Sequence, residues 1–121
     1  MSKASSRAEP ALIPAFEFVK ITEAAAVAAA KLRGRGDEAA ADEAAALAMY
    51  RELAQLPFAG TVVVGEGEEG EIPNLYIGET IGSGGAEVEL AVDPIEGSTL
   101  CAKALPNALA VIAIAEPGSF L

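Results

Sequence analysis

The sequence has few basic residues and only one cysteine. Its 121 residues include eight lysines and arginines, no histidine and one cysteine, Cys101, against 18 aspartates and glutamates. The formal charge of −10 argues against binding to nucleic acid or anionic lipid, because both need basic patches. One cysteine cannot form an internal disulfide, and its apolar neighbours favour a packed thiol over a reactive one. Cations are the natural partners of such a chain.

Long apolar segments are also missing from the sequence. The longest runs, such as Ala108–Ala115, are far shorter than the roughly 20 residues that a membrane-spanning helix requires. Lys3 and Arg7 near the start are not followed by the apolar segment of a secretory signal. We therefore expect a cytoplasmic protein with no membrane partner.

The composition fits a single globular unit. Hydrophobic residues make up 52% of the chain and charged residues 21%, which favours a folded domain over a disordered chain. Residues 1–13 mix serine, alanine and proline with charges, so we expect a flexible leader there. The folded unit is expected to span residues 14–121.

Two helices are predicted in the first half of the folded unit. One begins near Pro14 and ends before Gly34, and the other begins after Asp37 as N-cap and runs to about Leu56. In both, apolar residues recur at steps of three and four, which gives each helix one apolar stripe. Each helix should therefore pack on one face.

The second half of the chain predicts a sheet. Short runs typical of strands occur at Thr61–Val64, Leu75–Ile77 and Glu87–Val92, and Ala108–Ala115 is apolar throughout, as in a central strand. Gly82–Gly85 is interpreted as a hairpin loop. The fold class predicted from these elements is α+β, with two N-terminal helices packed on a mixed, largely antiparallel sheet.

Asp42 is the first acid in an unusual place. It shares the apolar face of the second helix with Ala45, Ala46 and Met49. Because an unpaired buried charge costs several kcal/mol, Asp42 should be exposed, paired or bound to a cation. The competing interpretation is that it lies in the first turns, where the helix dipole favours acids.

A second group of acids follows a buried strand. The loop Gly65–Glu71 contains four glutamates, and its glycines let the backbone turn sharply. Acids at a strand end can hold a hard cation such as Mg²⁺ or Mn²⁺, which prefers oxygen ligands. A solvated acidic turn is the commoner role of such a segment.

The third group is the segment Asp93-Pro94-Ile95-Glu96-Gly97-Ser98. Asp93 is expected to end a strand because Pro94 cannot continue the ladder, and a short helix should open at Glu96–Thr99. This order can aim Asp93 and Glu96 at one cation while the N–H groups after Gly97 face a phosphate. The alternative is an ordinary capped helix after a strand.

Together these segments resemble the class II fructose-1,6-bisphosphatases of the lithium-sensitive, metal-dependent sugar phosphatase superfamily. The resemblance covers about residues 15–121 and rests on Gly34–Asp37, Ala41-Asp42, Gly60–Glu68, Leu75–Glu79, Ala91–Gly97 and Asn107–Val111. It implies a layered αβαβα fold and hydrolysis of the 1-phosphate of fructose 1,6-bisphosphate, and in some relatives of sedoheptulose 1,7-bisphosphate, in gluconeogenesis or the Calvin cycle.

The resemblance also implies roles for individual residues. Asp42, Glu66, Asp93 and Glu96 would be ligands of Mn²⁺ or Mg²⁺, and Glu66, Asp93 and Glu96 would be catalytic through a metal-activated water. Gly97, Ser98 and Thr99 would bind phosphate. The sugar bisphosphate and divalent cations are the implied partners.

Three departures from the family pattern qualify this assignment. Glu38 stands where relatives commonly have lysine, and Gly70 stands where they have an aspartate expected to help activate the water. Family members are also more than twice as long. We therefore expect residues 14–121 to be the N-terminal metal-binding portion of a sugar-bisphosphatase domain, associating with itself or with the missing half. The alternatives are an inactive metal-binding half-enzyme or partner module, and a phosphatase for another substrate such as an inositol phosphate.

Overall fold

The computed structural model describes residues 13–120 of the chain. The predicted leader, residues 1–13, lies outside this range except for Ile13. Seven elements follow in order: α1 (Ala15–Ala30), α2 (Glu38–Ala54), β1 (Phe58–Val64), β2 (Thr80–Ile81), β3 (Ala86–Glu96), α3 (Ser98–Ala102) and β4 (Leu109–Ala115).

The two long helices form where the sequence predicts them. Pro14 directly precedes α1, and its fixed φ suits a helix start. The side chain of Asp37 caps α2 by accepting a hydrogen bond from the amide of Ala40 at 3.0 Å. In the described range, 13–120, no helix is long and apolar enough to cross a membrane.

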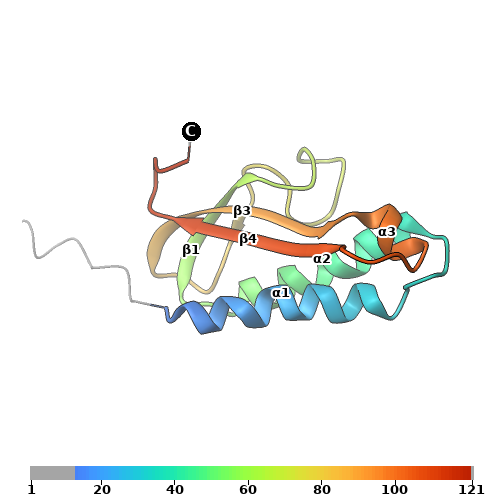
Figure 1. The fold of residues 1–121 in the computed structure, drawn as a ribbon. Coiled ribbons are helices and arrows are strands. Elements are labelled where there is room, and N and C mark those ends of the chain that lie inside the picture. Colours follow the sequence, from blue (N-terminus) through green and yellow to red (C-terminus); the bar gives the residue numbers. More distant parts are fainter. Residues whose placement is uncertain (1–12, 121) are drawn as a thin grey trace, which may run out of the picture.

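The four strands form one mixed sheet. Their order is β2-β1-β3-β4, with β1 parallel to β3 and the other two pairs antiparallel. Both α1 and α2 lie against the same face of this sheet (Figure 1). The predicted fold class, helices packed on a mixed and largely antiparallel sheet, is confirmed.

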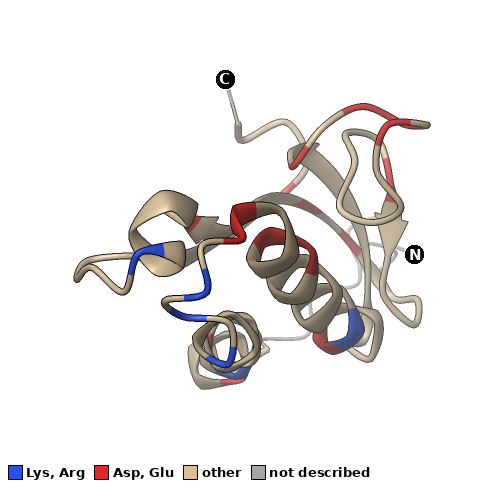
Figure 2. Cartoon of the chain, turned by 90° about the vertical axis from the view of Figure 1, so that its right-hand side faces the viewer, with Lys and Arg blue, Asp and Glu red and all other residues tan. Residues whose placement is uncertain are grey.

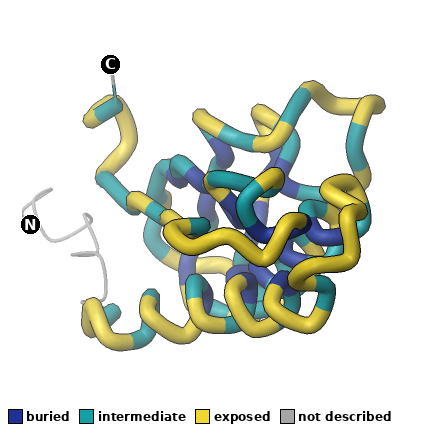
Figure 3. The backbone as a smooth tube through the Cα atoms, turned by 45° about the vertical axis from the view of Figure 1, so that its right-hand side comes forward, coloured by how far each residue is buried: buried dark blue, intermediate teal, exposed yellow. Residues whose placement is uncertain are grey.

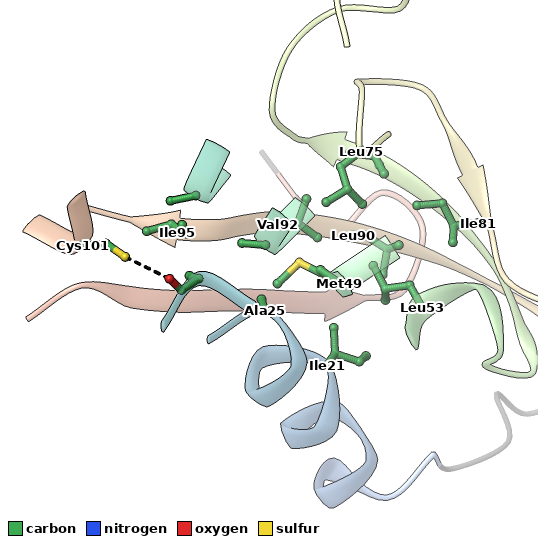
Figure 4. Close-up of a cluster of buried hydrophobic side chains, with 14 of the residues drawn as sticks. Ile21, Ala25, Met49, Leu53, Leu75, Ile81, Leu90, Val92, Ile95 and Cys101 are labelled. Atoms are coloured by element: carbon green, nitrogen blue, oxygen red, sulfur yellow. Dashed lines mark hydrogen bonds between the residues drawn. The ribbon is translucent and has the colours of Figure 1, made fainter. Parts of the chain in front are cut away.

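The core lies between the helix pair and the sheet, where the buried residues gather (Figure 3). Met49 and Leu53 of α2 are fully buried beside Leu90 of β3 (Figure 4). Cys101 is also buried, and its thiol donates to the carbonyl of Ala29 at 3.5 Å. The cysteine is therefore a packed thiol, as expected from its neighbours.

Two predictions for the segment between β1 and β3 were wrong. Leu75–Ile77 is not a strand, because Leu75 has a left-handed φ of 62° and Gly78 one of 93°; the short strand is Thr80–Ile81 instead. Gly82–Gly85 is not a hairpin loop either. It joins β2 to β3, and these two strands pair with opposite edges of β1.

Two predictions for the last strands also need correction. The apolar segment Ala108–Ala115 supplies β4, but β4 lies at the edge of the four described strands and its side chains alternate in exposure. β3 does not end at Asp93 but continues to Glu96, and its ladder with β4 is irregular between those residues. Pro94 has no N–H for the ladder, so it produces an irregularity instead of a strand end.

Candidate active site

Three segments meet at a cleft of about 570 Å³. They are the first turns of α2, the loop after β1, and the turn between β3 and α3. Asp42, Glu66 and Ser98, one predicted site residue from each segment, line this cleft together with Asn74. The fold therefore brings together side chains that are up to 56 positions apart in the sequence.

Hydroxyls at the start of α3 bond to acids on α2. The hydroxyl of Ser98 donates to Oδ1 of Asp42 at 2.5 Å, and that of Thr99 donates to Oε1 of Glu38. Glu38 and Asp42 are four residues apart and so lie on one side of the helix. Figure 2 shows acidic residues in the first turns of α2, close to α3. Asp42 is thus half-buried and has a hydrogen-bond partner, which agrees with the expectation that a carboxylate on the apolar face is not left unpaired.

Glu66 lies in a strongly negative environment. Partial burial raises the pKa of Glu66 from its ordinary 4.5 to about 7, and the nearby charges of Asp93 and then Asp42 act in the same direction. The pKa of Asp93 is also raised, first by burial and then by the charges of Glu96 and Asp42, while the amide of Ile95 opposes the shift. Two of the predicted metal ligands, Glu66 and Asp93, therefore have pKa values raised by burial and by other predicted ligands.

No basic side chain of residues 13–120 forms an ion pair with these acids. Within residues 13–120 the only ion pair joins Lys20 to Glu17 on α1, away from the cleft. As the side chains stand, no three possible ligands in that range lie close enough together to hold one ion. Asp93 is half-buried and Glu96 exposed, and neither lines the cleft. A four-ligand metal site remains a prediction.

The turn into α3 depends on Gly97. Its φ of 96° and ψ of 48° are left-handed, and a Cβ there would lie 3.0 Å from the side chain of Leu100. Glycine is therefore the residue that fits this turn. Of the three predicted phosphate-binding residues, Ser98 faces the cleft, whereas Gly97 and Thr99 do not line it.

One buried acid was not singled out from the sequence. Glu79 is 8% exposed, and its carboxylate accepts a hydrogen bond from the amide of Leu75 at 2.6 Å. An acid directly after the apolar run and glycine of Leu75–Gly78 was a visible signal. A strand over Leu75–Ile77 would give no reason to bury Glu79, whereas the observed turn does.

Comparison with known sequences identifies the family of the chain. Residues 13–121 match the family described as bacterial fructose-1,6-bisphosphatase, glpX-encoded. The chain belongs to this family. The resemblance to class II fructose-1,6-bisphosphatases inferred from the motifs is thereby confirmed.

Similar relatives carry names that agree with the family. The chain is 52% identical over 108 residues to fructose-1,6-bisphosphatase 1 class 2 of Escherichia coli strain K12, covering 88% of this chain and 32% of the relative. It is 47% identical over 103 residues to the D-fructose 1,6-bisphosphatase class 2/sedoheptulose 1,7-bisphosphatase of Parasynechococcus marenigrum strain WH8102, covering 84% and 31%. The chain thus spans about a third of the length of these class II bisphosphatases.

Proposed function

We propose that this chain carries part of the site for divalent-metal-dependent hydrolysis of the 1-phosphate of fructose 1,6-bisphosphate. Sedoheptulose 1,7-bisphosphate is the second substrate suggested by the name of one relative. The observation that carries the proposal is the convergence of Asp42, Glu66 and Ser98 on one cleft, where Ser98 donates to Asp42. Family membership supplies the substrate class.

The acids fit a hard divalent cation such as Mn²⁺ or Mg²⁺. Asp42, Glu66, Asp93 and Glu96 offer only oxygen ligands, which these ions prefer. Burial is the main cause of the raised pKa values of Glu66 and Asp93, and a cation would relieve the charge repulsion that adds to it. When bound, such an ion neutralises phosphoryl oxygens and lowers the pKa of a coordinated water.

The chain's own residues would then orient the phosphate. The hydroxyl of Ser98, which donates to Asp42 in this structure, would donate to a phosphate oxygen in the complex. The hydroxyl of Thr99 and the amides that follow Gly97 would add further donors. Glu66 would take up a proton near neutral pH only while no cation is bound, because its pKa of about 7 is that of the metal-free chain.

The test compares two acids of the same strand. Phosphate release from fructose 1,6-bisphosphate should require added Mn²⁺ or Mg²⁺ and fall by about 100-fold or more in Glu96→Gln, since a lost ligand removes electrostatic stabilisation of the transition state. Glu87→Gln, which alters an exposed acid at the other end of β3, should leave the rate unchanged. Undiminished turnover in Glu96→Gln would refute the role assigned to Glu96.

A non-catalytic binding module is the second candidate. Gly70 and Glu38 replace the aspartate and lysine expected from the family, and Glu38 accepts the hydroxyl of Thr99. Calorimetric titration with Mn²⁺ and fructose 1,6-bisphosphate separates the two candidates. Binding without phosphate release supports the module, and clear turnover by the chain excludes it.

A further inference from the structure

The turn formed by residues 75–79 holds the segment that carries Glu66. Four backbone hydrogen bonds join the turn to residues 62–67 on both sides of the end of β1. They run from Val62 N to Glu79 O (2.9 Å), Glu66 N to Leu75 O (2.9 Å), Ile77 N to Gly67 O (2.9 Å) and Gly78 N to Val62 O (2.8 Å). The backbone of Glu66 is therefore fixed by this turn.

Leu75, the first residue of the turn, contacts both Glu66 and Glu79 through its backbone. Its side chain is fully buried among the core residues (Figure 4), yet its backbone has a left-handed φ of 62°. A non-glycine residue in this conformation costs about 1–2 kcal/mol, so surrounding contacts must maintain it. The contact that does so at the amide of Leu75 is the hydrogen bond to the Glu79 carboxylate, 2.6 Å long.

The backbones of Leu75 and Gly65 lie too close together for a side chain at position 65. A Cβ built on Gly65 would lie 2.3 Å from the carbonyl oxygen of Leu75. Residue 65 must therefore be glycine for the carbonyl of Leu75 to reach the amide of Glu66. A rotation of Leu75 would move this carbonyl and release the backbone of Glu66.

We propose that Glu79 is a positioning residue for Glu66, acting through Leu75. The Glu79 carboxylate holds Leu75 in its left-handed conformation, and the carbonyl of Leu75 then holds the backbone from which the Glu66 carboxylate extends toward the cleft. The importance of this arrangement for metal binding rests on the function proposed for Glu66. The hydrogen-bonded connection itself does not.

The chemistry of the acceptor distinguishes three variants. Glu79→Gln keeps a side-chain oxygen at the same reach, whereas Glu79→Met keeps the length and removes the acceptor. In Glu79→Met the buried amide of Leu75 loses its partner, which is costly. Glu79→Asp keeps the charge but shortens the side chain by one methylene, and serves as the second variant if Glu79→Met does not fold.

The experiment combines native-state amide exchange with titration of Mn²⁺. In Glu79→Met, or Glu79→Asp, the amides of Leu75 and Glu66 should exchange at least about 10-fold faster relative to the core amide of Leu90, with Mn²⁺ affinity falling about 10-fold. Glu79→Gln should change each quantity less than about 3-fold. The matched control, Glu87→Met at an exposed site on β3, should change neither.

The outcomes separate this inference from the proposed function. If the exchange of Glu66 is unchanged in Glu79→Met, or rises no more than that of Leu90, the positioning role is refuted. If Mn²⁺ affinity is lost in Glu66→Gln and kept in Glu79→Met, the metal site stands and the positioning role is again refuted. If the parent chain does not bind Mn²⁺ but Glu66 exchanges faster in Glu79→Met, the connection is supported and the proposed metal site fails.

Discussion

Glu66 is exposed to solvent and nevertheless has a raised pKa. Its side chain is exposed where it lines the cleft, yet burial of part of it and the charges of Asp93 and Asp42 raise its pKa to about 7. The folded chain therefore binds a proton at Glu66 more tightly than the unfolded chain does. Folding must then become less favourable as the pH rises from about 4.5 to about 7, because only the unfolded form ionises freely in that window.

Urea denaturation in metal-free buffer should reveal this linkage. We expect the free energy of unfolding to be lower at pH 8 than at pH 5, with Glu66 contributing on the order of 1 kcal/mol after solvent screening. The raised pKa values of Glu79 and Asp93 act in the same direction. Glu66→Gln should reduce the difference and Glu87→Gln should not. An equal pH dependence in the parent chain and in Glu66→Gln would contradict the prediction.

At the scale of the elements, local signals predicted the helices better than the connections. The N-cap Asp37 and the apolar stripe of α2 act within a few residues, so the sequence shows them directly. The turn at Leu75 depends on the distant backbone of Val62 and Glu66 and on a buried carboxylate, which periodicity cannot reveal. The edge position of β4 likewise depends on strand order, not on composition.

The same contrast applies to the candidate site. The sequence identified the acids and hydroxyls through strand ends, helix starts and family motifs, because those are properties of short segments. It did not reveal that Ser98 bonds to Asp42 or that Thr99 bonds to Glu38. Those pairs require the packing of α3 against α2.

The packing face of α2 can be tested with two leucines of the same helix. Leu53 is fully buried between the helices and the sheet, whereas Leu47 is 36% exposed. Leu53→Ala should lower the free energy of unfolding by about 2–5 kcal/mol through lost burial and a residual cavity. Leu47→Ala should change it by less than about 1 kcal/mol. Equal losses in urea denaturation would show that the assigned face of α2 is wrong.

At the scale of the whole molecule, the two faces of the sheet differ. Both long helices cover one face, and on the other side of β4 Leu109 and Val111 are 59% and 41% exposed. β4 is also an edge strand within the described sheet, and its outer backbone groups can pair with another strand. Apolar side chains beside an open edge favour association.

We therefore predict that the chain self-associates through β4, with a second copy as the occupant of this surface. Light scattering should give a mass above that of one chain, and Val111→Lys should shift the population toward monomer and lower the binding of a hydrophobic dye, because a lysine on an edge strand opposes pairing. Val27→Lys is the matched control: Val27 is 58% exposed on α1, on the helix side, so its substitution should leave the mass unchanged. A monodisperse monomer without dye binding would contradict the prediction, and so would dissociation caused equally by both lysines.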